Sequence, residues 1–342
     1  MILKERIPRL TIVIPTLNRA TLVVRAIDSA MAQTFQDIEI IVSNNGSTDN
    51  TSTVLERYIG APRVRILQRE QTISANEHGR YLVEQARGEF FLGLSDDDWI
   101  EPDMVARVIE RFDQDPRLKL VWTGCLMYYA DIGVPALTGP DVEPGHSFLA
   151  AFVAGNRNVC WCACVTRKAD LLRLGPPPDK TICGDMFFWT KLAAEGDVGC
   201  VGQILSHYCC YRPRGDGMAG GTPIKEWINE QGGWVSDIVA TCCAIPAGRP
   251  YSNRLNRDAN RFLARTLANQ FAMNALRGED RFSLLMAIQQ NFYYLKKGKP
   301  LNWFTVAASI IAPRVLLECL VLVQAKRRAE ARSILGMTVT QK

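Results

Sequence analysis

Residues 89–103, EFFLGLSDDDWIEPD, join a short apolar run to three adjacent carboxylates. The apolar part, residues 90–94, is typical of a strand that is buried on both faces of a parallel sheet. Asp96, Asp97 and Asp98 follow it directly. Neighbouring carboxylates repel one another and favour protonation of one partner unless a positive charge lies nearby. The stretch therefore predicts a buried strand whose carboxyl end meets a positively charged group.

Similar strands precede this one in the chain. Apolar, β-branched runs occupy residues 10–16, 38–44 and 63–67, and helical patterns begin near Leu22, near Thr48 and near Asn76. This alternation predicts an α/β fold with a mostly parallel central sheet and helices on both faces. Asn18 or Thr21 is expected to cap the first helix. Ligands of such sheets bind beyond the carboxyl ends of the strands, where the aspartates lie.

Length and charge limit the classes of protein. With 342 residues the chain is long enough for two domains, and its net charge is +5. This charge suits an anionic ligand or membrane surface but is too weak to indicate a nucleic-acid partner. The strand pattern ends near residue 212 and helical patterns follow, so we expect a catalytic domain at 1–215 and a helical region at 216–342.

The eleven cysteines do not form a disulfide framework. Cys160, Cys162 and Cys164 alternate in CWCAC, which predicts a strand with its cysteines on one face. Zinc is the alternative, but the spacing is not that of a zinc site, so reduced core thiols are favoured. Charged residues and Pro8 interrupt the amino-terminal segment, which does not resemble a signal peptide. We expect a cytoplasmic protein.

The three aspartates suit a hard divalent cation. The first strand ends in Pro15-Thr16-Leu17-Asn18-Arg19, so neither a dinucleotide-binding glycine motif nor a P-loop follows it. Carboxylates with no neighbouring His or Cys favour Mg²⁺ or Mn²⁺, which could stabilise a departing diphosphate. The alternative is that the aspartates cap the next helix, whose first turn we place at Pro102.

Four motifs in order resemble glycosyltransferase family 2. They are TIVIPTLNRATLVVRAIDSAMAQT, IEIIVSNNGSTDNT, ARGEFFLGLSDDDW and GDMFFWTKLAAEG, and the similarity covers about residues 8 to 215. The resemblance implies a GT-A fold, a nucleotide-sugar donor (UDP-, dTDP- or GDP-linked) and inversion at the anomeric carbon. It also implies a glycan or lipid-linked acceptor in bacterial polysaccharide assembly, such as O-antigen or capsule.

The resemblance assigns roles to residues at the strand ends. Asp96 would contact the ribose and Asp98 the metal, with Asp97 between them. Asn44, next to Asn45, stands where the family usually has an aspartate that accepts the pyrimidine N3–H; an amide oxygen can still accept this bond. For Asn18 and Asn44, ordinary turn chemistry remains the alternative. The resemblance further implies a nucleotide pocket that is lined by Pro15, Thr16, Asn18 and Arg19.

Two further residues complete the expected site. Asp185 stands at the family's catalytic-base position, although Gly184 replaces the usual Glu before it; the alternative is that Asp185 caps a helix. Arg212 matches the family's Tyr-Arg and could bind phosphate or form a structural ion pair. The glycine-rich stretch 213–223 could close over the donor.

The carboxyl-terminal stretch 302–328 is apolar but interrupted. Pro313, Arg314 and Glu318 disfavour a membrane-spanning helix. Flanking aromatic and basic residues suit a helix lying on an anionic membrane surface, which a lipid-linked acceptor would explain. A buried helix or a homo-oligomer contact suits the same pattern. Two other functions also stay open: a nucleotidyltransferase, and a catalytically silent sugar-binding or scaffold protein.

Overall fold

The computed structural model describes residues 7–177 and 184–211, and helical residues at 235–236, 238–240, 255–265, 268, 306–307 and 314–334. The chain divides into two compact units. The first contains Met1–Met127, Thr138–Pro144 and Val159–Cys209, and the second contains Tyr128–Leu137, Gly145–Asn158 and Cys210–Lys342. The predicted boundary at residue 215 lies outside the described residues and stays a prediction.

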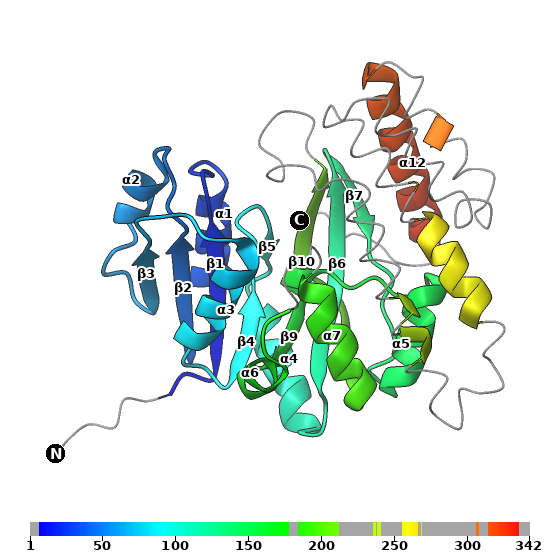
Figure 1. Ribbon diagram of the computed structural model, residues 1–342, viewed down its shortest axis with the longest axis horizontal. Coiled ribbons are helices and arrows are strands. Elements are labelled where there is room, and N and C mark those ends of the chain that lie inside the picture. Colours follow the sequence, from blue (N-terminus) through cyan, green and yellow to red (C-terminus); the bar gives the residue numbers. More distant parts are fainter. Residues whose placement is uncertain are drawn as a thin grey trace. The chain divides into compact units, whose positions relative to one another are not determined.

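A mixed β-sheet forms the centre of the first unit (Figure 1). The strands lie in the order β3-β2-β1-β4-β9-β6-β10-β5, with β8 beside β10. The first four are parallel, whereas β9 runs antiparallel to both β4 and β6. The α/β class is confirmed. The strands are β1 (Leu10–Thr16), β2 (Ile38–Asn44), β3 (Val64–Gln68), β4 (Phe90–Gly93), β5 (Trp99–Ile100), β6 (Leu120–Tyr129), β8 (Val142–Glu143), β9 (Cys164–Arg167) and β10 (Val198–Tyr211).

The register of the parallel strands brings their carboxyl ends together. Thr16 pairs with Asn44 across β1 and β2, and Val13 pairs with Gly93 across β1 and β4. Every residue of β2 is buried, as expected for a strand covered on both faces. The loops after β1, β2 and β4 therefore leave the sheet at one edge, where sequence analysis expects the ligand.

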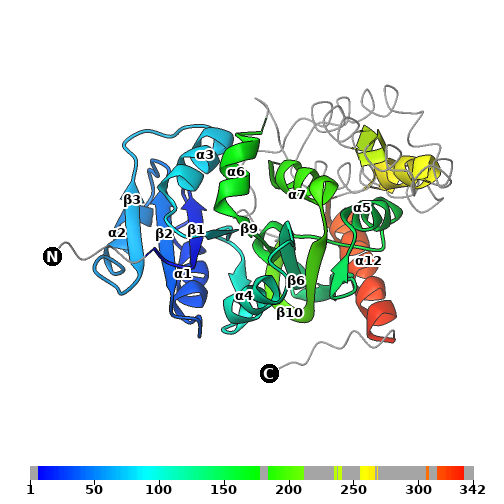
Figure 2. The ribbon, with the colours of Figure 1, turned by 90° about the horizontal axis from the view of Figure 1, so that it is seen from below.

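Helices cover both faces of this sheet. Figure 2 shows α1 and α4 on one face and α3, α6 and α7 on the other. On the second face Leu82, Leu171 and Phe188 pack with Val13 and Phe91 of the strands. The helices of the first unit are α1 (Val23–Met31), α2 (Thr51–Glu56), α3 (Ala75–Gln85), α4 (Met104–Gln114), α6 (Lys168–Leu174) and α7 (Gly184–Glu195).

Two predictions about helix caps were wrong. Neither Asn18 nor Thr21 caps α1, because the N-cap is Leu22, which makes no side-chain cap bond. The aspartate triplet does not cap α4 either, since that helix begins at Met104 with Asp103 before it. The alternative that the three carboxylates cap the next helix is therefore excluded.

The expected strand at residues 160–164 was also wrong in its bounds. Trp161–Ala163 form a turn of 3-10 helix, and β9 begins only at Cys164. The indole of Trp161 occupies the space beside Gly93 where a Cβ would lie. Cys160, Cys162 and Cys164 are buried and form no disulfide, as expected of core thiols.

The second unit contains the end of β6, β7 (Ile132–Pro135), α5 (Gly145–Ala154) and α12 (Arg314–Ile334). Arg332 of α12 donates to the carbonyl of Pro135, at the end of β7. Among the residues that the structure describes, no helix is both long and apolar enough to cross a membrane.

Candidate functional site

Three asparagines link the loops at the carboxyl edge of the sheet. Asn18 adopts a left-handed conformation with φ of 55°, and its Oδ1 accepts the backbone N–H of Thr48 at 2.7 Å. Asn44 Oδ1 accepts the N–H of Ser47 at 3.0 Å. Asn45 exchanges hydrogen bonds with the backbone of Ile73, at 2.9 and 3.2 Å. The turn chemistry considered for Asn18 and Asn44 is thus present, and it joins the loops after β1, β2 and β3.

Arg19 brings positive charge to the aspartates. Its Nη1 lies 2.8 Å from Asp96 Oδ1 and 3.2 Å from Asp97 Oδ2. Burial raises the pKa of the Asp96 carboxyl, which Arg19 partly offsets. Burial disfavours the Arg19 cation. The charges and hydrogen bonds of Asp96 and Asp97 together outweigh this effect, so the pKa of Arg19 is raised. Two of the three carboxylates are therefore already compensated within the chain, by a residue that the sequence placed in the same site.

Asp98 has no such cation. Its side chain is fully buried, and Oδ1 accepts the backbone N–H of Cys209 at 2.9 Å. No donor among the described residues reaches its buried Oδ2 in hydrogen-bond geometry. Burial, and then the charge of Asp97, raise the pKa of the Asp98 carboxyl well above its usual range. An ionised Asp98 thus requires a further positive group at Oδ2.

A divalent cation fits this requirement. The described residues contain no group of three or more His, Cys, Asp or Glu side chains that could hold a metal alone. Mg²⁺ and similar ions, however, often take one or two carboxylates and complete their shell with water and substrate phosphates. Asp98, through Oδ2, is the residue that suits such an ion.

A stack of side chains that sequence analysis missed supports the aspartate loop. The guanidinium of Arg25 lies 3.6 Å from the ring centre of Trp99, and Trp99 stacks on His207 with ring centres 4.6 Å apart. His207 Nε2 lies 2.8 Å from Glu101 Oε1. Arg25 also donates to the carbonyl of Asp97 at 2.7 Å. This stack holds the backbone of the triplet, and His207 is part of it.

The charge of Asp185 acts on Cys164, at the start of β9. Asp185 is the second residue of α7, and burial together with its charge raises the pKa of the Cys164 thiol to about 12. The pKa of the Cys162 thiol is raised as well. Burial is the largest cause, followed by a hydrogen bond with Cys125 and the charge of Asp98. The charge of Asp185 thus acts on Cys164 and that of Asp98 on Cys162, two residues earlier in the chain.

The presence of glycine at position 184 has a steric explanation. A Cβ at this position would lie 3.3 Å from Pro177 Cγ and 3.6 Å from Asn76 Oδ1. A glutamate here would need Pro177 to move, which gives a local account of the departure from the family pattern. Of the other expected residues, Thr16 is buried at the end of β1 and Pro15 is half-buried beside it. Arg212 and the stretch 213–223 lie outside the described residues.

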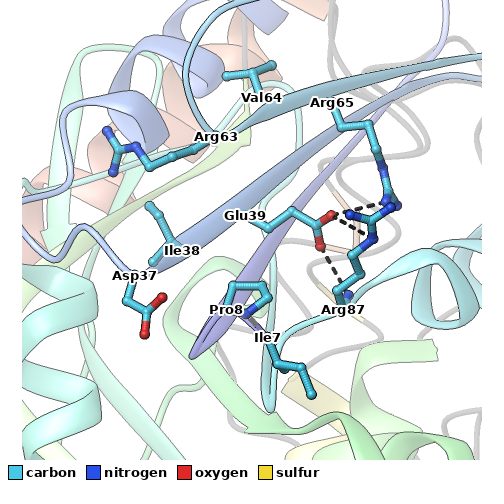
Figure 3. Close-up of a pocket in the computed structure, with 9 residues that line it drawn as sticks. All are labelled: Ile7, Pro8, Asp37, Ile38, Glu39, Arg63, Val64, Arg65 and Arg87. Carbon is cyan, nitrogen blue, oxygen red and sulfur yellow. Dashed lines mark hydrogen bonds and ion pairs between the residues drawn. The ribbon is translucent and has the colours of Figure 1, made fainter. Parts of the chain in front are cut away.

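A separate pocket lies at the opposite edge of the same sheet (Figure 3). It measures about 770 Å³ and contains Glu39 near its centre. Glu39 pairs with Arg65 at 3.1 Å and accepts from Thr11 Oγ1 and the N–H of Arg87, each at 3.0 Å. These bonds join β1, β2 and β3 to the turn before β4. We assign them a structural role.

The fold defines a class of protein. The sheet resembles that of TarS from S. aureus in complex with UDP-GlcNAc, with a TM-score of 0.57 and 16% identity over 91% of this chain and 90% of that one. A mannosyltransferase from Pyrobaculum calidifontis in complex with GDP-Man and Mn²⁺ gives a TM-score of 0.53 and 16% identity, over 92% of this chain and 87% of that one. At this identity the likeness concerns the fold alone, which is GT-A.

The sequence matches a known family. Residues 11–134, about a third of the chain, match the family described as "Glycosyl transferase family 2". Chondroitin synthase of Pasteurella multocida is 39% identical over 120 residues, 35% of this chain and 12% of that protein. A Campylobacter jejuni GalNAc(5)-diNAcBac-PP-undecaprenol beta-1,3-glucosyltransferase is 31% identical over 109 residues, 31% of this chain and 35% of that protein. The chain thus covers only a minor part of these relatives.

Proposed function

We propose that the protein transfers a sugar from a nucleoside-diphosphate sugar to an acceptor hydroxyl, with inversion at the anomeric carbon. The observation that carries the proposal is the buried Oδ2 of Asp98, for which the described residues supply no hydrogen-bond partner, beside an arginine-paired aspartate cluster at the carboxyl edge of the sheet. The family match of residues 11–134 supports the same reaction.

The donor would bind across the linked loops. Asp96 would accept a ribose hydroxyl, while Arg19 pairs with Asp96 and Asp97 and orients them. Asn44 Oδ1 already accepts one backbone N–H but has a second lone pair for the pyrimidine N3–H. Pro15 and Thr16 would line the pocket, and Asn18 and Asn45 would hold its walls through their backbone bonds.

Asp98 would hold Mg²⁺ or Mn²⁺ together with the phosphates of the donor. When bound, the ion would neutralise the negative charge that develops on the departing diphosphate. Asp98 must lose its proton before it can act as a ligand, so ion affinity should fall at low pH. Arg212 could add a cation on the phosphate side.

Asp185 would act as general base on the acceptor. Its carboxylate removes the proton of the attacking hydroxyl as that oxygen forms a bond to C1 of the sugar. The bond between C1 and the phosphate oxygen breaks, and its electron pair leaves with the diphosphate. Attack from the face opposite the leaving group inverts C1. Asp185 is one of the first residues of α7, so its backbone is fixed by the packing of Phe188.

The acceptor would be a glycan intermediate of a bacterial surface polysaccharide. The relatives named above act in chondroitin synthesis and on an undecaprenol-linked saccharide, which supports this class of acceptor. A lipid-linked acceptor would place the protein at the inner membrane surface. On α12, Lys326 and Arg327 are exposed and could contact anionic lipid heads.

A thermal-shift screen with UDP-, dTDP- and GDP-sugars, each with Mn²⁺ or with EDTA, tests donor binding. We expect one donor class to raise the melting temperature only when the ion is present. Hydrolysis or transfer of the matched sugar then separates an enzyme from a silent sugar-binding protein. A nucleoside triphosphate that is consumed with release of pyrophosphate, while every nucleotide-sugar is inert, would favour a nucleotidyltransferase instead.

Membrane association needs its own test. The protein without its last ~45 residues should no longer sediment with vesicles that contain phosphatidylglycerol, because α12 supplies the basic residues. Sedimentation that is unchanged by this truncation would exclude α12 as the anchor.

A further inference from the structure

Three arginines of the second unit lie near one another, and two of them contact the same turn. Arg265 lies in the helical residues 255–265, and Arg328 and Arg332 lie four residues apart on α12. Residues at this spacing occupy the same face of a helix, one turn from each other. All three side chains are half-buried. Arg265 and Arg332 contact the turn that follows α5 and includes Gly155 and Asn158.

Contacts fix two of the guanidinium groups on this turn. Arg332 donates to Asn158 Oδ1 at 3.3 Å and to the carbonyl of Pro135. Asn158 is itself held, because its Oδ1 accepts the N–H of Leu137 at 3.2 Å and its N–H donates to the Leu137 carbonyl at 3.0 Å. The side chain of Arg332 is therefore oriented by groups that cannot easily rotate.

Arg265 reaches the turn on its other side. Its guanidinium lies against Gly155, so closely that a Cβ on this residue would collide with it. Gly155 has φ of 84°, which only glycine adopts without strain. Glycine at position 155 thus serves two purposes: it adopts the required backbone conformation, and its lack of a side chain leaves room for Arg265.

The three positive charges repel one another. Burial, and then the charge of Arg328, lower the pKa of Arg265, and the same two causes lower the pKa of Arg332. Within the described part of the chain, no carboxylate forms an ion pair with any of the three. A like-charged pair at this helical spacing is destabilising, so the cluster costs stability unless an anion joins it.

We propose that Arg265, Arg328 and Arg332 form a binding site for a phosphate or diphosphate group. Guanidinium groups present planar pairs of N–H donors that match phosphate oxygens, and several arginines together bind the doubly charged group well. Half-burial strengthens each of these bonds relative to an exposed contact. Asn158 and Gly155 act by holding the donors in place before the anion arrives.

Two kinds of molecule carry a phosphate group that would fit this site. One is the acceptor, through a group such as the diphosphate that joins a saccharide to its lipid; this source rests on the proposed function. The other is an anionic membrane lipid, through its headgroup. The arginine cluster belongs to the second unit, and its binding of phosphate does not depend on the donor site.

Melting temperatures with added pyrophosphate, in EDTA and at constant ionic strength, test the site in the full-length protein. Arg328→Gln should weaken the pyrophosphate response about tenfold or more, because a charged hydrogen bond contributes about 1.5–3 kcal/mol. Without pyrophosphate the same variant should melt at a higher temperature than the wild type, since one repelling charge is gone. Arg327→Gln is the matched control: it removes an exposed charge from the same helix and should leave the response unchanged.

The outcomes separate the alternatives. A pyrophosphate response that survives Arg328→Gln, or that Arg327→Gln reduces equally, would overturn the proposal. If Arg328→Gln loses the pyrophosphate response and also binding to phosphatidylglycerol vesicles, the source is a lipid headgroup; retained vesicle binding indicates the acceptor's phosphate. Donor binding with Mn²⁺ should be the same in wild type and Arg328→Gln. A protein that binds pyrophosphate through this cluster but transfers no sugar would refute the proposed function alone.

Discussion

His78 provides a quantitative test of the electrostatics beneath the candidate site. Its side chain is 3% exposed, and its Nε2 lies 2.8 Å from Ser43 Oγ, next to Asn44. Burial, and then the charge of Arg69, lower the pKa of His78 to about 4. In an unfolded chain the pKa of histidine is about 6.5. Between these values the unfolded state binds more protons, so the free energy of unfolding falls as the pH drops.

We expect His78→Gln to remove this pH dependence. A difference of roughly 2.5 pKa units, at about 1.4 kcal/mol per unit, corresponds to about 3 kcal/mol lost by the wild type between pH 6.5 and 4. Above about pH 6.5 the variant should be less stable by about 1 kcal/mol, because the bond to Ser43 is weakened. The order of stability should then reverse at about pH 6, where the wild type has lost about 1 kcal/mol, and by about pH 5 the variant should be the more stable by about 1 kcal/mol.

Urea unfolding followed by circular dichroism, at several pH values from about 7.5 to 4.5, measures this difference. The same substitution at the half-buried His146 of α5 is the control, because it makes the same chemical change away from Ser43. A constant difference in stability between wild type and His78→Gln across this range would refute the reasoning. Such a result would mean that the folded protein protonates His78 as readily as the unfolded chain does.

Three further substitutions test the site. Asp98→Asn should abolish the Mn²⁺-dependent rise in melting temperature with the donor, whereas Asp98→Glu should retain part of it; full retention in the amide variant would contradict the metal assignment. Asp185→Asn should bind the donor normally and lose transfer by about 10²–10⁴-fold, and unchanged turnover would exclude Asp185 as the base. Gly93→Ala should cost about 1–3 kcal/mol in urea unfolding, because its Cβ would meet Trp161, whereas Gly202→Ala, with open space around it, should cost little. Equal costs at both glycines would contradict the packing argument.

The parallel half of the sheet was predictable because its strands are continuous apolar runs. The bounds expected for residues 10–16 and 38–44 are those of β1 and β2. The antiparallel half was not, since β9 follows a turn of 3-10 helix in which Trp161 packs against Gly93 of β4. Such a contact joins residues far apart in sequence, which periodicity within one segment cannot show.

The candidate site was predictable to a similar extent. The triplet Asp96–Asp98 lies at the expected edge, but Arg25 and Cys209, which fix its backbone, carried no local signal. Cys209 is adjacent to Cys210 in a strand, and nothing in that pair indicates that its N–H would bind Asp98. The capping box at the start of α3 does carry a local signal, because a serine followed three residues later by a glutamate is typical of a helix start. These residues are Ser74 and Glu77.

The asparagine bonds between the loops also affect how a donor would bind. Asn18, Asn44 and Asn45 already fix backbone that a nucleotide would otherwise have to order on arrival. Ordering backbone costs about 1–2 kcal/mol per residue, so a wall formed in advance leaves more of the contact energy as affinity. It also narrows the range of nucleotides that fit, since a rigid wall cannot adjust to another base. Discrimination between donors would then depend on the carboxamides that join the loops as much as on the side chains that touch the sugar.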